Sequence, residues 1–152
     1  MRGAGAPDEV ADRLAIVDLL SRYATALDHR DWALLDQFFT ADAEGRYGGR
    51  SLVGCEAVQR MIRGMLDGCG PTQHLLGNFR IELAGDEARS VCSIRAFHAG
   101  IGAAAGQTYE VFGEYRDALV RMPEGWRVAR RLMWVSQEIG SREVLGPGKV
   151  AR

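Results

Sequence analysis

An apolar stripe near the start of the chain predicts a long amphipathic helix. Its members are spaced four, three and four positions apart, as on one face of an α-helix: Ile16, Leu20, Tyr23 and Leu27. We expect this helix over residues 8–27. Asp28 follows the stripe directly, so its carboxylate is placed to face the mouth of the core rather than water. The alternative interpretation is an ordinary acidic residue at a helix end.

Two shorter helices and a short strand are predicted before the midpoint of the chain. The apolar residues of 32–39 and 55–67 have helical spacing, and Asp31 is placed to cap the first of these two helices. A Gly-Cys-Gly-Pro sequence ends the other. Residues 44–47 fit a short strand, which the Gly48-Gly49 pair breaks.

The remainder of the chain is predicted to be β-structure. Four long runs of strand composition are separated by turn sequences and cover residues 72–83, 88–101, 107–122 and 126–138. Strands of this length imply a strongly curved, mainly antiparallel sheet with bulges. The order of helices first and strands afterwards predicts an α+β fold, in which three N-terminal helices cover a cone-shaped sheet. Such a cone encloses an apolar pocket suited to a small molecule.

The chain is expected to form one domain. Its 152 residues suffice for a substantial core, and no internal repeat is visible. We expect a flexible lead at residues 1–7, a single domain at residues 8–140 and a loose tail at residues 141–152. The first residues lack the apolar segment of a signal peptide, and no apolar run is long enough to cross a membrane.

Composition narrows the classes of partner. The net charge is −1 and the arginines are dispersed, which argues against a nucleic-acid-binding protein. Three cysteines without a C-x-x-C motif fit a reduced, cytoplasmic location. We therefore expect a cytoplasmic protein that binds a small molecule, with neither nucleic acid nor membrane as a partner.

Two histidines are candidates for acid–base chemistry. His74 and His98 lie on neighbouring predicted strands, joined by a turn at residues 85–87. A three-residue loop there would put the two residues directly opposite each other, with Cβ atoms about 5 Å apart. A two-residue loop or a single bulge would put them on opposite faces instead. His29 lies in a charged turn and is expected to be solvated.

A histidine beside a buried carboxylate forms a general acid–base site. The carboxylate favours the imidazolium and burial favours the neutral ring, so the balance can hold the pKa near neutrality. The alternative for each histidine alone is a hydrogen-bonded structural role. A zinc site is a rival use, but His74, His98 and the distant Cys92 show no known ligand spacing. The G-x-G-x-x-A sequence at residues 100–105 opens no helix, so it does not predict a dinucleotide-binding site. We therefore expect neither a metal nor a cofactor.

Tyrosines are the other candidates. Tyr23 lies on the helical stripe, Tyr47 ends the short strand, and Tyr109 and Tyr115 share one face of a later strand. A phenol in an apolar pocket can donate a hydrogen bond to a carbonyl or a developing enolate. It can equally fill the core with its hydroxyl in water, as we expect for Tyr109.

Two adjacent arginines, Arg130 and Arg131, occupy opposite faces of the last predicted strand. One of them must face inward or into an interface. The alternation of the strand does not decide which.

Three segments together resemble a known family. They are Tyr23…Leu27-Asp28-His29-Arg30-Asp31-Trp32, Thr72-Gln73-His74 and Gly125-Trp126-Arg127-Val128. They resemble the SnoaL-like families of the nuclear-transport-factor-2-like superfamily, with scytalone dehydratases and bile-acid 7α-dehydratases as the nearest relatives. The resemblance covers roughly residues 8–138 and implies the same fold that the order of elements predicts.

The resemblance also implies roles for individual residues. Asp28 matches the catalytic aspartate, His74 the catalytic histidine, and His98 the second histidine of scytalone dehydratases. Tyr47 matches a tyrosine that helps bind the substrate carbonyl, and Tyr23 a pocket tyrosine of the bile-acid enzymes. The chain departs from scytalone dehydratases in having Leu27 directly before the aspartate, where they carry a tyrosine. Their serine and asparagine on the fourth strand fall near Gly113 and Tyr115, so we count Tyr115 among the expected substrate-binding residues.

We therefore expect a cofactor-independent lyase or isomerase, of dehydratase or cyclase type, for a small, mostly apolar ketone or polyketide-like substrate. His74, oriented by Asp28, would remove a proton α to a carbonyl, and Tyr23 and Tyr47 would hold the enolate. His98 would donate to a leaving hydroxyl or bind it. The alternative is a non-catalytic domain for small-molecule binding or assembly. A homo-oligomer, dimer or trimer, is expected because the outer face of so long a sheet must carry apolar residues.

Overall fold

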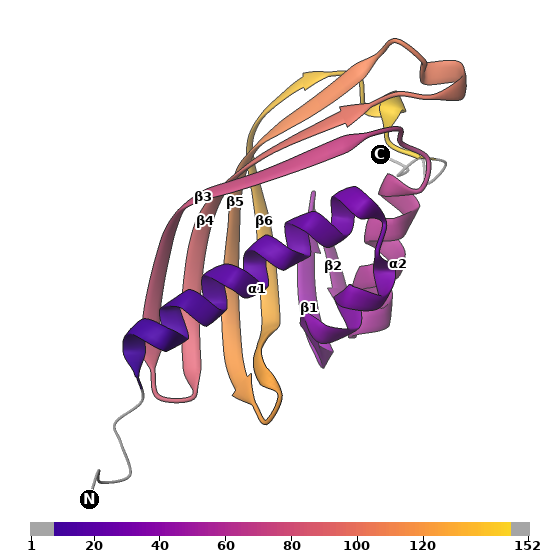
Figure 1. The fold of residues 1–152 in the computed structure, drawn as a ribbon. Helices are drawn as coiled ribbons and strands as arrows, with labels where there is room; N and C mark the ends of the chain where they lie inside the picture. The colour runs from indigo at the N-terminus through magenta and orange to yellow at the C-terminus, as the bar shows by residue number, and fades with distance from the viewer. Residues whose placement is uncertain (1–7, 147–152) are drawn as a thin grey trace, which may run out of the picture.

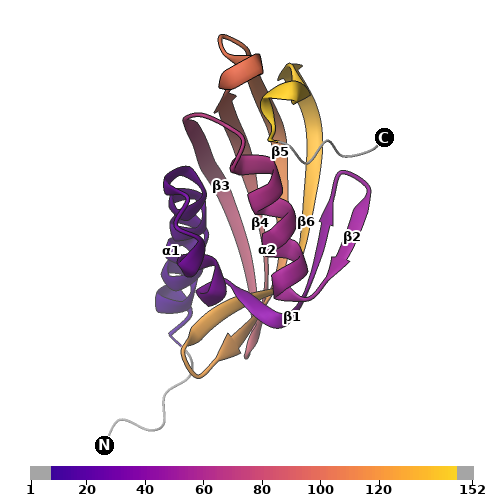
Figure 2. The same ribbon diagram turned by 90° about the vertical axis from the view of Figure 1, so that its right-hand side faces the viewer.

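The computed structural model describes residues 8–146 (Figure 1). The predicted lead at residues 1–7, and the part of the predicted tail at residues 147–152, lie outside the described residues. One long helix, α1, crosses the hollow face of a bent sheet, and a shorter helix, α2, lies beside it near the strands β1 and β2 (Figures 1 and 2). This arrangement confirms the predicted α+β fold.

Helix α1 spans Glu9–His29 and begins at Asp8, whose carboxylate accepts hydrogen bonds from the backbone N–H groups of Val10 and Ala11. The predicted apolar stripe is its buried face. The helix ends where Arg30 adopts a left-handed conformation, with φ of 57°. It ends two residues later than predicted, so Asp28 lies in the last helical turn rather than after the helix.

The segment after α1 differs most from the prediction. The expected second helix is a short 3₁₀-helix, η1 (Trp32–Gln37), and Phe39 already begins strand β1 (Phe39–Tyr47). Asp31 precedes η1 but makes no side-chain cap. The Gly48-Gly49 pair forms a hairpin turn, with φ of 53° and 82°, into a strand that the sequence did not reveal, β2 (Arg50–Val53). Helix α2 (Cys55–Leu66) agrees closely with the third predicted helix.

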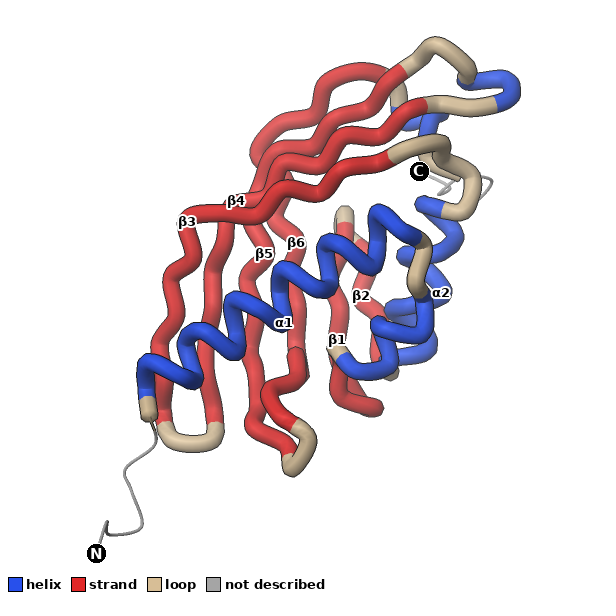
Figure 3. Tube along the Cα trace, in the orientation of Figure 1, coloured by secondary structure: helices blue, strands red, loops and turns tan. Residues whose placement is uncertain are grey.

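The sheet has six strands in the order β2-β1-β6-β5-β4-β3. Its four long members are β3 (Thr72–Ala84), β4 (Glu87–Ala99), β5 (Thr108–Met122) and β6 (Gly125–Gly140). Only β1 and β6 pair in parallel; every other neighbouring pair is antiparallel. The strands bend sharply about halfway along, as Figure 3 shows, and register shifts occur in β3 and twice between β5 and β6.

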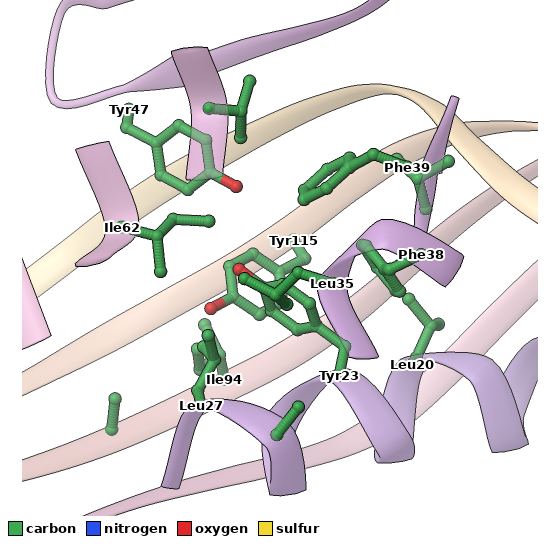
Figure 4. Close-up of a cluster of buried hydrophobic side chains, with 14 of the residues drawn as sticks. Leu20, Tyr23, Leu27, Leu35, Phe38, Phe39, Tyr47, Ile62, Ile94 and Tyr115 are labelled. Atoms are coloured by element: carbon green, nitrogen blue, oxygen red, sulfur yellow. The ribbon is translucent and has the colours of Figure 1, made fainter. Parts of the chain in front are cut away.

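The two faces of the sheet have different compositions. The inner face and the helices enclose the core, part of which Figure 4 shows. The outer face carries a group of large apolar side chains that are exposed or half-buried, here called the outer apolar face: Leu75, Phe97, Phe112 and Trp134. Within residues 8–146, neither α-helix is long and apolar enough to cross a membrane.

The residues after β6 do not begin a loose tail, as we had expected for residues 141–152. A 3₁₀ turn, η3 (Arg142–Val144), follows the strand, and the Val144 side chain is only 1% exposed. The Val144 carbonyl accepts a hydrogen bond from the Cys69 thiol at 3.2 Å. The Gly146 N–H donates to the Met65 carbonyl at 2.8 Å. These contacts fasten residues 141–146 to the end of α2.

Candidate functional site

Asp28 and His74 form a hydrogen-bonded pair although 46 residues separate them. Oδ1 of Asp28 lies 2.7 Å from Nδ1 of His74, and Oδ2 accepts the backbone N–H of His74 at 2.9 Å. A carboxylate only accepts hydrogen bonds, so Nδ1 must carry the ring hydrogen and Nε2 is left as the basic atom of a neutral imidazole. The His74 side chain is 6% exposed and that of Asp28 is 18% exposed. The pair is therefore sheltered from water.

Thr72 and Arg30 hold the carboxylate in place. The Thr72 hydroxyl donates to Oδ1 of Asp28 at 3.0 Å and accepts from Nη1 of Arg30 at 2.8 Å. The same guanidinium also donates to four backbone carbonyls, those of Leu27, Asp28, Leu66 and Gly70. Arg30 thus ties the end of α1 to the loop before β3, and it forces the Thr72 hydrogen toward Asp28.

Burial alone would raise the pKa of Asp28. The hydrogen bonds from the His74 ring and backbone and from Thr72 outweigh that effect, so the pKa lies below its usual value. Asp28 is therefore ionised at neutral pH and able to stabilise an imidazolium on His74.

His98 is the second histidine of the site, and its ring centre lies 5.4 Å from that of His74 at nearly a right angle. The route to this contact differs from the prediction. The turn is a two-residue loop at Gly85-Asp86, and a bulge after Gly77 shifts the register once more. Each change alone would have put the histidines on opposite faces, but together they restore the parity. His74 therefore pairs with Ala96, and His98 is its diagonal neighbour.

The tautomer of His98 decides its role. Its Nδ1 lies 3.1 Å from the Tyr109 carbonyl, an acceptor, so Nδ1 carries the hydrogen and Nε2 accepts. Burial and the neighbouring His74 lower the pKa of His98 to about 4. At neutral pH, Nε2 of His98 can therefore accept a hydrogen bond and carries no hydrogen to donate. Of the two expected roles, donating to a leaving hydroxyl or binding it, this tautomer suits the second.

Three of the predicted tyrosines are buried in the core: Tyr23, Tyr47 and Tyr115. Tyr23 and Tyr115 meet edge to face, with ring centres 5.8 Å apart, and Tyr47 approaches them from β1 (Figure 4). Burial, and secondarily the neighbouring Tyr23 phenol, raises the pKa of Tyr47 and of Tyr115 well above 10, so both remain hydrogen-bond donors. The Tyr47 hydroxyl is buried without a hydrogen-bond partner among residues 8–146.

Arg131 completes this cluster; the sequence had left open whether Arg130 or Arg131 faces inward. The guanidinium is fully buried 3.8 Å from the ring centre of Tyr115 and 4.4 Å from that of Tyr23. Asp117, equally buried, accepts from Nε at 2.8 Å and from Nη2 at 2.6 Å. Nη1 finds no partner within the described chain. Arg130 faces outward and pairs with Glu44 on the surface.

The candidate residues thus form two neighbouring groups. The dyad group holds Asp28, His74 and His98, with Thr72 and Arg30 behind them. The phenol group holds Tyr23, Tyr47, Tyr115, Arg131 and Asp117. Tyr23 lies five residues before Asp28 on α1, which is a rise of about 7.5 Å along the helix axis.

Tyr109 adjoins the dyad group through His98, and the centres of the two rings lie 5.4 Å apart. The Tyr109 ring is buried in the core, as expected, and its hydroxyl donates a hydrogen bond to the partly exposed Glu138. Among residues 8–146, no group of three or more His, Cys, Asp or Glu side chains could hold a metal ion. An open hollow of about 440 Å³ lies on the outer side of the sheet beside Leu75 and Phe112 and contains none of the predicted site residues.

Known proteins are similar to this chain in sequence and in fold. Residues 8–132 match the model of the SnoaL-like domain family. An uncharacterized protein of Mycobacterium tuberculosis is 35% identical over 129 residues, which are 82% of this chain and 85% of that protein.

Two solved structures show the same architecture. A candidate scytalone dehydratase from Novosphingobium aromaticivorans superposes with a TM-score of 0.81 at 20% identity, over 95% of this chain and 97% of that one. The hexachlorocyclohexane dehydrochlorinase LinA type 3 from Novosphingobium barchaimii gives 0.77 at 19% identity, over 88% and 92%. At such identities these structures support the fold alone. The family match over most of the chain shows more: this chain belongs to the SnoaL-like domain family.

Proposed function

We propose that the protein is a cofactor-independent lyase or isomerase that removes a proton α to the carbonyl of a small, mostly apolar ketone. The observation that carries this proposal is the 2.7 Å contact between Asp28 and His74 in a sheltered position. It fixes the tautomer of His74, directs a basic Nε2 away from the carboxylate, and provides a negative charge to stabilise the imidazolium.

In the first step, Nε2 of His74 takes the α-proton, and the electrons of the broken C–H bond move into the enolate. The oxygen of the enolate needs hydrogen-bond donors. The Tyr47 hydroxyl and Nη1 of Arg131 are buried donors whose hydrogen-bonding capacity is unused within residues 8–146, and Tyr23 lies beside them. Preorganised donors of this kind stabilise an oxyanion more than the neutral carbonyl.

The fate of the enolate decides between isomerase and lyase. If the substrate carries a β-hydroxyl, His98 accepts a hydrogen bond from it through Nε2 and so positions it near His74. The imidazolium of His74 then returns its proton to the departing oxygen, and water leaves as the C=C bond forms. If there is no leaving group, the proton returns to a different carbon and the product is an isomer.

The names of two structural neighbours favour elimination. One is a candidate scytalone dehydratase and another a dehydrochlorinase, and dehydration and dehydrochlorination both remove a proton from the carbon next to the one that bears the leaving group. A dyad of neutral histidine and carboxylate suits both reactions. We therefore place lyase chemistry ahead of isomerisation.

Solvent exchange tests the proposal without knowledge of the substrate. The protein is incubated in D₂O with a series of cyclic and aryl ketones, and loss of the α-proton signals is followed by NMR. We expect exchange above the buffer rate for ketones that bind. His74→Gln should slow it by about 10²–10⁴-fold, as for removal of a general base. The matched control is His29→Gln, because His29 is an exposed histidine in the last turn of α1.

Two results would count against an enzyme. One is ketone binding without exchange in the unaltered protein, which would favour a non-catalytic binding domain. The other is exchange that survives His74→Gln unchanged. Asp28→Asn should also slow exchange, because the amide can donate to Nδ1 and so favour the wrong tautomer.

A further inference from the structure

The ion pair between Arg131 and Asp117 carries more information than a donor alone. Both side chains have no exposed surface. The carboxylate takes Nε and Nη2 in a two-pronged contact, which leaves the two N–H groups of Nη1 without a partner in residues 8–146. An unused charged donor at zero exposure is rare in folded proteins and calls for an explanation.

The charge of this donor is already compensated. Arg131 and Asp117 together have no net charge, and aromatic rings of Tyr115, Tyr23 and Phe38 surround the guanidinium. A neutral carbonyl oxygen could accept from Nη1 and from the nearby Tyr47 hydroxyl without bringing new charge into the core. A carboxylate at the same place would add an uncompensated buried charge and would be repelled by Asp117.

We infer that Asp117 is a specificity-determining residue, which makes the phenol group select a neutral ketone or other neutral oxygen acceptor over a carboxylate of the same shape. This inference rests on the proposed function in taking the phenol group as the place of the substrate carbonyl. It is separate from catalysis, because it concerns binding and involves neither histidine. Without Asp117, the same guanidinium would be a strong site for anions.

Matched ligand pairs test the inference directly. Three pairs that differ in size are titrated into the protein at pH 7 by calorimetry: cyclohexyl methyl ketone and cyclohexanecarboxylate, acetophenone and benzoate, 2-acetonaphthone and 2-naphthoate. We expect each ketone that binds to do so at least about tenfold more tightly than its carboxylate. Asp117→Asn should reduce that preference by at least about tenfold or reverse it. Glu44→Gln, which removes the carboxylate of the exposed pair with Arg130, should leave the preference unchanged.

A second variant keeps the test valid if Asp117→Asn does not fold. The combined change Asp117→Leu with Arg131→Met replaces the whole pair by apolar side chains, which buried sites often tolerate. It should weaken ketone binding by several-fold, because the Nη1 donor is gone. Unchanged ketone affinity in this variant would overturn the inference.

Other outcomes also decide the question. Carboxylates that bind as tightly as the ketones, no binding by any of the three ketones, or an unaltered preference in folded Asp117→Asn would each overturn the inference. The last result would mean that Nη1 holds only a water molecule. Failure of the proposed function looks different: ketone preference would persist while α-proton exchange is absent or insensitive to His74→Gln.

Discussion

The buried, neutral His98 should make the protein lose stability in mild acid. Its side chain is 5% exposed, and burial lowers its pKa from the ordinary 6.5 to about 4. Between these two pH values, His98 is protonated in the unfolded chain but neutral in the folded protein. The free energy of unfolding therefore falls as the pH drops from about 6.5 to about 4 and is unaffected by this group above that range.

The size of the effect follows from the shift. At about 1.36 kcal/mol for each pKa unit, a fall from 6.5 to about 4 corresponds to about 3 kcal/mol, of which about 2 kcal/mol is lost by pH 5. Urea unfolding from pH 8 to pH 4.5 measures this directly. His98→Asn keeps a donor for the Tyr109 carbonyl but cannot titrate.

The difference between the two proteins isolates the histidine. The free energy of unfolding of the wild-type protein minus that of His98→Asn should be constant above pH 7. It should fall by about 2 kcal/mol between pH 7 and pH 5. Carboxylates with lowered pKa, such as Asp28, destabilise the protein only at lower pH and are common to both proteins. His29→Asn, on the surface, should leave the wild-type profile in place. A difference that stays constant from pH 7 to pH 4.5 would show that His98 is not held neutral by the fold.

Three further predictions concern positioning, packing and assembly. Thr72→Val removes the donor to Asp28 and should slow α-proton exchange by about tenfold, with Thr72→Ser restoring it and the unfolding midpoint little changed. Gly113→Ala should lower the free energy of unfolding by about 1–3 kcal/mol in urea, because a Cβ there overlaps the carbonyl oxygen of Trp134. The control Gly64→Ala, on an open helix surface, should raise the free energy of unfolding slightly. We also expect a homo-oligomer through the outer apolar face, so light scattering should give a multiple of 16.7 kDa that Trp134→Glu reduces to a single chain.

The acid–base pair could be predicted because its signals are local. Asp28 ends an apolar stripe on one helix, and His74 lies two residues into a strand whose start Pro71 marks. The family resemblance then linked two positions that no spacing rule connects. The sequence left open whether His74 and His98 share a face, because a two-residue loop or a single bulge would each separate them. The structure has both of these features, and their effects on the side-chain alternation cancel.

Arg131 could not be predicted because a bulge breaks the alternation of β6. Register shifts at Ala129, so Val128 and Arg131 both face inward although three positions separate them. Strand β2 was missed for a related reason: its four residues show no alternation of buried and exposed side chains, and the Gly48-Gly49 turn reads as a break. Bulges and turns are set by tertiary packing, which the period of a strand does not encode.

The two groups of the site fit together through their charges. In the proposed first step a proton leaves the substrate for His74, so an imidazolium and an enolate appear together and the net charge of the interior is unchanged. Asp28 stabilises the first, at 2.7 Å, and donors of the phenol group stabilise the second. Arg131 can supply such a donor at the core only because Asp117 balances its charge before the substrate arrives. An anionic substrate would disturb that balance before any proton moved. The dyad and the buried ion pair therefore support the same proposal, in which the interior takes a neutral substrate that becomes charged only during the reaction.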